Sequence, residues 1–104
     1  MDKNSIDDFK GAIADFTKTI AIDPDYYRAY ARRGFAKDDL GEYYGAIADY
    51  NKVIEMRDDD VYIIKKRGIS KENISDLNGA CNDWKKAASL GNEESAQWVR
   101  DQCN

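Results

Sequence analysis

The sequence contains no histidine, a single proline and only two cysteines among its 104 residues. Without histidine, the side chain that most often acts as a general base near neutral pH is missing, and a zinc site would lack its usual nitrogen ligands. Cys81 and Cys103 lie too far apart for a CxxC pair, and the chain has no nucleophile or phosphate-loop motif. An enzyme is therefore the least favoured class, and no catalytic residue, metal or cofactor is expected.

Long apolar runs and positive net charge are also absent. No stretch approaches the roughly 18 consecutive apolar residues of a membrane helix, and MDKNSIDDFK at the start has no apolar signal core. A net charge of −4 weighs against binding to a phosphate backbone. We therefore expect neither membrane nor nucleic acid as a partner, and a cytoplasmic location by default unless the chain is a fragment. In a reducing compartment Cys81 would be a small core residue and Cys103 a partly exposed free thiol.

Three segments of the sequence resemble one another at intervals of 34 residues. GAIADFTKTIAIDP begins at Gly11, GAIADYNKVIEMRD at Gly45 and GACNDWKKAASLGN at Gly79, and residues 32–46 similarly match residues 66–80. Apolar residues in each copy recur every three or four positions, which is typical of amphipathic helices, and no two-residue alternation typical of strands is sustained. The sequence thus predicts an all-α protein whose repeating unit is a pair of antiparallel helices.

Capping and turn residues divide the chain into six predicted helices. Side-chain caps, proline or acidic residues mark their starts: near Ile6 after Ser5, at Pro24 after Asp23, at Glu42, after Asp58 to Asp60, after Ser75 and after Asn92. Gly41 and Gly91 suit the left-handed residue that follows the end of a helix. The first four helices are expected to end near Ile22, Leu40, Met56 and Asn73.

The repeating unit resembles the tetratricopeptide repeat, whose pattern is W-x2-L-G-x2-Y, then A-x3-F, then P. Two units offer residues at all these places, namely Tyr30, Arg33, Gly34, Lys37, Ala46, Tyr50 and Asp58, then Ile64, Arg67, Gly68, Lys71, Ala80, Trp84 and Asn92. The first unit supplies only Ala12, Phe16 and Pro24. Arginine in place of leucine and lysine in place of tyrosine recur in register, which resembles a subtype common in bacterial members.

The resemblance implies an all-α right-handed superhelix, or solenoid, of about two and a half repeats and a capping helix. Its expected division is a half repeat over 1–22, repeats over 25–58 and 59–92, and a C-terminal capping helix over 93–104. Small residues such as Gly34 and Ala46 would let helices approach closely, and the aromatic residues would fill the space between units.

In the resembled family, the first helices of the units line a concave groove that binds a peptide or helix of a partner. The residues predicted to line it here are Arg28, Arg32, Phe35, Tyr62, Lys65, Lys66 and Ile69. The cations could pair with carboxylates of an acidic protein or peptide, and the apolar side chains could anchor it. The charges could equally do no more than solvate exposed helix faces. The family's chaperone-binding clamp is not predicted, because Arg32 and Tyr62 stand where asparagine and lysine are expected.

The first unit lacks its first helix, so one flank of its remaining helix has no mate of its own. The residues predicted to associate with another copy through this flank are Phe9, Ile13, Phe16 and Ile20. The helix could instead serve as a half-cap, or the chain could be a piece of a longer array. The predicted function is a protein interaction scaffold, and a structural role as a homo-oligomer is the alternative.

Overall fold

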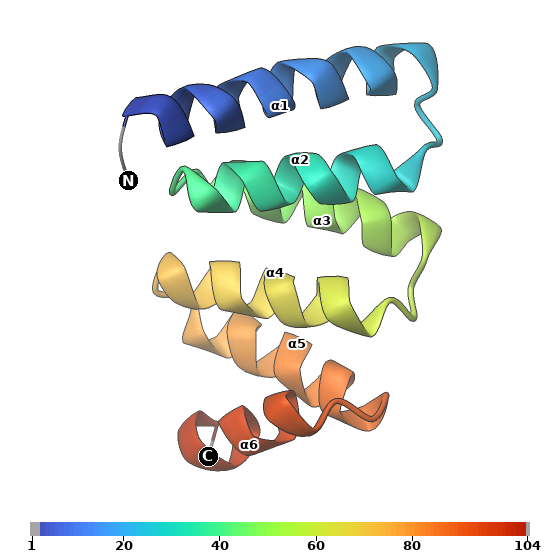
Figure 1. Cartoon of the computed structure of the whole chain (residues 1–104). Coiled ribbons are helices and arrows are strands. Elements are labelled where there is room, and N and C mark those ends of the chain that lie inside the picture. Colours follow the sequence, from blue (N-terminus) through green and yellow to red (C-terminus); the bar gives the residue numbers. More distant parts are fainter. Residues whose placement is uncertain (1–2, 104) are drawn as a thin grey trace.

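The computed structural model describes residues 3–103, which form an array of helices without a strand. The helices are α1 (Lys3–Ile22), α2 (Tyr27–Asp39), α3 (Tyr43–Met56), α4 (Val61–Asn73), α5 (Leu77–Ser89) and α6 (Glu93–Gln102). Each helix packs on the next one along the chain, and the two ends of the chain lie at opposite ends of the stack (Figure 1). The predicted all-α fold of six sequentially paired helices is confirmed.

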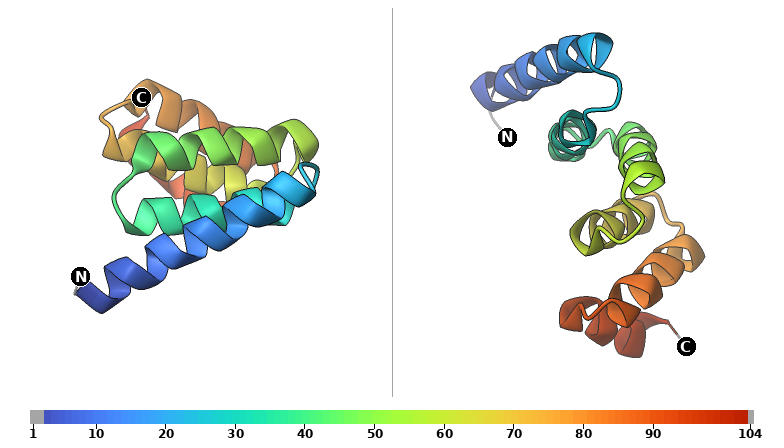
Figure 2. Two further views of the ribbon diagram at one scale, coloured as in Figure 1. Left: turned by 90° about the horizontal axis from the view of Figure 1, so that it is seen from above. Right: turned by 90° about the vertical axis from the view of Figure 1, so that its right-hand side faces the viewer.

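The helices zigzag between two layers. Seen along the helix axes, α2, α4 and α6 lie on one side and α3 and α5 on the other, while α1 crosses the end of the stack (Figure 2). The molecule is accordingly elongated, with extents of 40 × 32 × 19 Å. Because a single helix pair cannot bury its apolar face, each unit depends on its neighbours for a core.

Residues with positive φ end three of the helices. Gly41 (φ 78°) and Gly91 (φ 102°) take the left-handed conformation predicted for them. Ser75 (φ 66°) does the same, so the prediction that Ser75 caps the fifth helix is wrong. Asp76 caps α5 instead, by accepting a hydrogen bond from the amide of Gly79. Asp60 and Asn92 cap α4 and α6 as predicted.

Two predicted helix starts are also wrong. α2 begins at Tyr27 rather than Pro24, because Asp23 accepts a hydrogen bond from the amide of Asp25 and so holds Pro24 and Asp25 in a turn. α1 already includes Lys3, although Ile6 was the predicted start. In the 34-residue register, residues 6–8 correspond to the turn at residues 40–42. No described helix precedes α1 for the chain to turn away from, and helical hydrogen bonding continues through these positions.

Two buried aromatic side chains of the core each pack directly against a glycine of the preceding helix. Tyr50 is 0% and Trp84 1% exposed. A Cβ added to Gly34 would lie 2.5 Å from Tyr50 Cε1, and one added to Gly68 would lie 2.6 Å from Trp84 Nε1. The two glycines therefore let α2 approach α3, and α4 approach α5, more closely than any other residue would allow.

A charged clasp accompanies each of these contacts. Arg33 donates two hydrogen bonds to the buried carboxylate of Asp49 (2.9 and 2.6 Å), and Lys37 Nζ lies 3.2 Å from Asp49 Oδ2. Arg67, Lys71 and Asp83 repeat the arrangement one unit later. The arginine and lysine that depart from the family pattern thus have a structural role, which is to neutralise an aspartate buried between paired helices.

A further hydrogen-bond network joins three helices. The hydroxyl groups of Tyr50 and Ser70 both donate to the carboxylate of Asp38, which connects α3 and α4 through α2. Burial, followed by the hydrogen bond to Asp38, raises the pKa of Tyr50 well above its ordinary value. The tyrosine therefore stays neutral and remains a donor at physiological pH.

Candidate partner-binding groove

A groove of about 370 Å³ runs between α2 and α4 on the layer that these helices share. It is lined by Tyr27, Arg28, Ala31, Arg32, Phe35, Asp60, Tyr62 and Ile63. At its floor, Phe35 and Tyr62 meet edge to face with ring centroids 5.8 Å apart. Tyr62 is 53% exposed, so it offers an aromatic surface as well as a hydroxyl to a partner.

Four of the seven predicted groove residues come together in this groove: Arg28, Arg32, Phe35 and Tyr62. Arg28 and Arg32 are exposed and form no ion pair within residues 3–103. A hydrogen bond with Tyr27 raises the pKa of Arg28 above the ordinary value of an arginine. Lys66 lies beside the groove, with Nζ 5.8 Å from the centroid of the Phe35 ring, and it too lacks an ion-pair partner among the described residues.

The other two predicted residues have different surroundings. Lys65 forms an ion pair of 3.1 Å with Glu94 of α6 and lies over the Tyr62 ring. Ile69 packs against the second core cluster, which contains Ala80, Cys81 and Trp84. The structure thus gives Lys65 and Ile69 contacts within the fold, and it leaves Arg28, Arg32 and Lys66 as the cations open to a ligand.

Sequence reasoning placed Ala31 beside the predicted groove residues of the second helix, but it missed three residues that also line the groove, namely Tyr27, Asp60 and Ile63. Ala31 and Ile63 are buried residues of the first core cluster that also line the groove. The guanidinium of Arg57, the residue that follows the last turn of α3, donates a hydrogen bond to the hydroxyl of Tyr27 (3.0 Å). This contact joins residues 30 positions apart, and no local spacing could have indicated it.

The four residues predicted to associate with another copy are all half-buried in α1. Thr17 of α1 accepts a hydrogen bond from Arg33 of α2 (3.3 Å), as Asn51 of α3 does from Arg67 of α4 (2.8 Å). α1 therefore turns the same face to α2 as α3 turns to α4. Ile13 and Ile20 lie within one helical turn of Thr17 on that face, whereas Phe16 corresponds to Tyr50 on the flank that α3 buries against α2.

The two cysteines form a disulfide, so the prediction of a free thiol at Cys103 is wrong. Cys81 is buried in the core as expected, but it is bonded to Cys103 directly after α6, with 5.7 Å between their Cα atoms. No spacing rule identifies such a bridge between a core residue and a chain end. The disulfide ties α6, the last helix among the described residues, onto α5.

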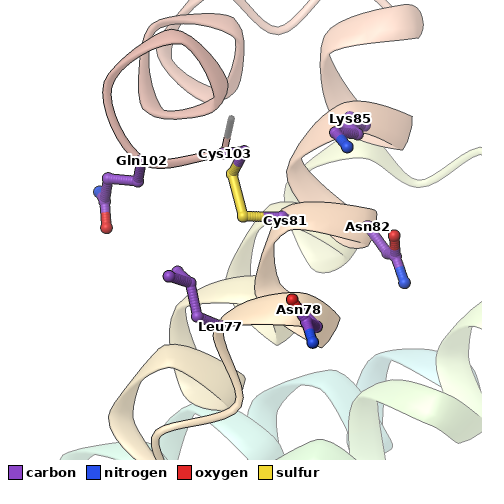
Figure 3. A pocket seen from close by; sticks show the side chains of 7 residues that line it. All are labelled: Leu77, Asn78, Cys81, Asn82, Lys85, Gln102 and Cys103. Atoms are coloured by element: carbon purple, nitrogen blue, oxygen red, sulfur yellow. A yellow bond between two sulfur atoms is a disulfide. The ribbon is translucent and has the colours of Figure 1, made fainter.

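A second pocket, of about 520 Å³, adjoins this disulfide (Figure 3). Besides the two cysteines it is lined by Leu77, Asn78, Asn82, Lys85 and Gln102. Of the described residues that line this pocket, Lys85 is the one with a titratable side chain. Among residues 3–103, no group of three or more potential ligand side chains could hold a metal ion.

Comparison with known proteins agrees with this architecture. The sequence model of the tetratricopeptide repeat family matches residues 27–60, which include α2 and α3. Among solved structures, the first tetratricopeptide domain of Spaghetti (RPAP3), bound to the HSP90 peptide SRMEEVD, has a TM-score of 0.83 and 22% identity over 90% of this chain and 76% of that chain. The TPR2B domain of yeast Sti1, in a complex with Hsp70, has a TM-score of 0.76 and 24% identity over 91% of this chain and 77% of that chain.

MamA has a TM-score of 0.78 and 28% identity over 88% of this chain and 53% of that chain, so the chain spans about half the length of MamA. No curated protein sequence matches the chain at a significant level. The chain is therefore an all-α protein with the fold of tetratricopeptide repeat domains, and residues 27–60 match the sequence model of that repeat. In the part of the chain that the structure describes, no helix is long and apolar enough to cross a membrane.

Proposed function

We propose that the chain is a protein interaction scaffold whose groove between α2 and α4 binds an acidic peptide or helix of a partner. The observation that carries the proposal is a set of three cations without ion-pair partners among the described residues, Arg28, Arg32 and Lys66, beside the half-buried ring of Phe35 and the exposed ring of Tyr62. In a protein of net charge −4, this is a local basic surface that would attract carboxylates. Arginine can also bind a carboxylate through two parallel hydrogen bonds.

Two structural neighbours support the proposal by analogy of fold. The RPAP3 domain was solved with an acidic HSP90 peptide and the Sti1 domain in a complex with Hsp70. At 22% and 24% identity these neighbours share the fold, and the choice of ligand depends on the side chains in the groove. Two points stay predictions. The first is that the recurring Arg-Gly-x2-Lys pattern marks a bacterial subtype of the repeat, and the second is the division into repeats over 25–58 and 59–92.

The test is capture of partners from the native host by the full chain carrying Arg32→Glu and Lys66→Glu. We expect this double variant to lose the partner while its helical circular dichroism is unchanged, because Arg32 is exposed, Lys66 is half-buried, and neither forms an ion pair among the described residues. The matched control carries Lys18→Glu and Lys85→Glu, which make the same change of charge on α1 and α5. Capture should also weaken as salt is raised. Equal capture by the double variant and the wild type would show that the partner does not bind in the groove.

The disulfide bears on the compartment in which the groove would work. Disulfides persist in oxidising compartments and are rare in the cytoplasm. We infer that the protein acts in an oxidising compartment rather than in the cytoplasm that the sequence suggested. Fractionation of the native host, with alkylation of free thiols at harvest, would detect the bridged form of Cys81 and Cys103. Recovery of the protein fully reduced in the cytoplasmic fraction would contradict the inference.

A further inference from the structure

The flank of α1 that faces away from α2 repeats the composition of a buried helix face. In the 34-residue register, Ala12, Asp15, Phe16 and Thr19 correspond to Ala46, Asp49, Tyr50 and Val53 of α3. The four residues of α3 are buried, none more than 3% exposed. In α1, Asp15 is exposed and the other three are half-buried. This flank therefore has the side chains of a helix-pairing surface without a described helix on it.

The two complete units show which side chains such a surface accepts. In each, the preceding helix offers an arginine and a lysine to the aspartate and a glycine to the aromatic ring, as Arg33, Lys37 and Gly34 do for Asp49 and Tyr50. Arg67, Lys71 and Gly68 do the same for Asp83 and Trp84. A helix with the pattern Arg-Gly-x2-Lys thus fits the flank both in charge and in shape.

Features of α1 itself also point to a cationic occupant rather than to any apolar surface. Asp15 has no ion-pair partner within residues 3–103, whereas its two counterparts are each bound by two cations. Thr19 stands where Val53 and Ala87 are fully buried, and its hydroxyl donates to the carbonyl of Asp15 (3.1 Å). The flank is thus more polar than a purely apolar dimer contact.

A second copy of the chain is a poor occupant. It could offer only two Arg-Gly pairs, Arg33–Gly34 and Arg67–Gly68, and both are already engaged within the fold. We propose that α1 instead binds an amphipathic helix of a partner protein that carries Arg-Gly-x2-Lys, and so completes the first helix pair. The site lies at one end of the stack, and it does not depend on the groove between α2 and α4.

The test uses the full chain, labelled with ¹⁵N, and a peptide that copies residues 25–40, DYYRAYARRGFAKDDL. A lactam bridge on the polar face holds the peptide helical, because short isolated helices are marginal in water. We expect saturable shifts of the amides of Ala12 to Thr19 in the NMR spectrum. The matched control peptide has glutamate for the arginine before the glycine and leucine for the glycine, and it should bind about tenfold or more weakly.

Variants of the chain test the same contact from the other side. Asp15→Arg should weaken binding about tenfold or more, since it replaces an attractive charge with a repulsive one. Asp58→Asn, a substitution on an exposed loop, should leave the affinity unchanged. The proposal is overturned if the control peptide binds equally well, if the shifts fall on Arg28 to Phe35 or on α3, or if no shift occurs at millimolar peptide. Light scattering that shows a dimer lost in Phe16→Ala would overturn it in favour of a second copy.

Discussion

Asp49 and Asp83 each accept hydrogen bonds from an arginine and lie within ion-pair distance of a lysine on the preceding helix. A buried carboxylate is costly unless cations and hydrogen bonds compensate for its lost hydration. The two clasps therefore fix the pairing of α2 with α3 and of α4 with α5, because any shift in register would leave a charge buried without a partner. Asp15 occupies the same register position in α1 and has no such constraint.

This difference predicts unequal effects of one substitution at two equivalent positions. Asp49→Asn should lower the free energy of unfolding by about 2 kcal/mol, because it leaves Arg33 and Lys37 facing a neutral group. Asp15→Asn should change it by less than about 0.5 kcal/mol, as is usual for exposed residues. Urea denaturation of the two variants measures both values. Equal losses at the two positions would show that the clasp does not contribute to stability.

The pKa of Tyr50 predicts a loss of stability in alkali. Since the folded protein keeps the hydroxyl protonated while the unfolded chain ionises near its ordinary pKa of 10.0, stability is fully present below pH 10 and falls above it. The expected loss from this group is about 1 kcal/mol between about pH 10 and pH 11. Tyr50→Phe should remove this part of the decrease in the free energy of unfolding with pH. Parallel pH profiles for the variant and the wild type, measured by urea denaturation, would contradict this prediction.

At the scale of elements, the close approach of α2 to α3 depends on Gly34. Gly34→Ala would place a methyl group against the fully buried ring of Tyr50, and it should destabilise the protein by about 1–3 kcal/mol. Gly11 of α1 has no atom within 4 Å of an added Cβ, so Gly11→Ala should stabilise the helix by up to about 1 kcal/mol. Thermal denaturation of both variants checks the opposite signs. A gain at Gly34 would mean that the helices can separate without cost.

α6 is only ten residues long and, among the described helices, packs mainly on α5, so the disulfide should matter most there. The bridge spans a separation of 22 residues, for which the loss of chain entropy in the unfolded state corresponds to about 3 kcal/mol. Cys103→Ser should lower the melting temperature, and a reducing agent should lower that of the wild type equally while leaving the variant unchanged. A reducing agent that has no effect on the wild type would show that the bridge does not stabilise α6.

Local patterns predicted the helices but could not predict their partners. The apolar spacing of three or four residues, Gly41 and Gly91 indicate where most helices lie, because these signals depend on neighbouring residues only. The start of α2 was misplaced because the turn at Asp23 competes with the cap that Asp-Pro usually forms. The disulfide, the ion pair of Lys65 with Glu94 and the contact of Arg57 with Tyr27 join distant positions, and they arise only once the units stack.

At the scale of the whole molecule, stacking assigns different surroundings to equivalent helices. Each of the helices α2 to α5 packs on both the preceding and the following helix, whereas α1 packs mainly on α2, and α6 packs mainly on α5 with one ion pair to α4 (Figure 2). The groove lies on this well-covered central part, so its arginines and aromatic rings are held on rigid elements. The open flank of α1 and the terminal helix α6 lie at the two ends. A ligand of the groove and a ligand of α1 would therefore bind independently.

The same layout predicts a gradient of local stability along the chain. In a stacked repeat, each unit is stabilised by its own pairing and by its immediate neighbours, so amides at the ends open more readily than those in the centre. We expect the amides of Tyr50, Val53 and Ile64 to exchange slowly with deuterium, and those of Phe9 and Gly11 to exchange fast. Native-state hydrogen exchange followed by NMR measures each amide directly.

Reduction of the disulfide should speed exchange of the amides in α6 without changing exchange in α3. If α1 were as protected as α3, its open flank would already be covered in solution, and the gradient would be contradicted.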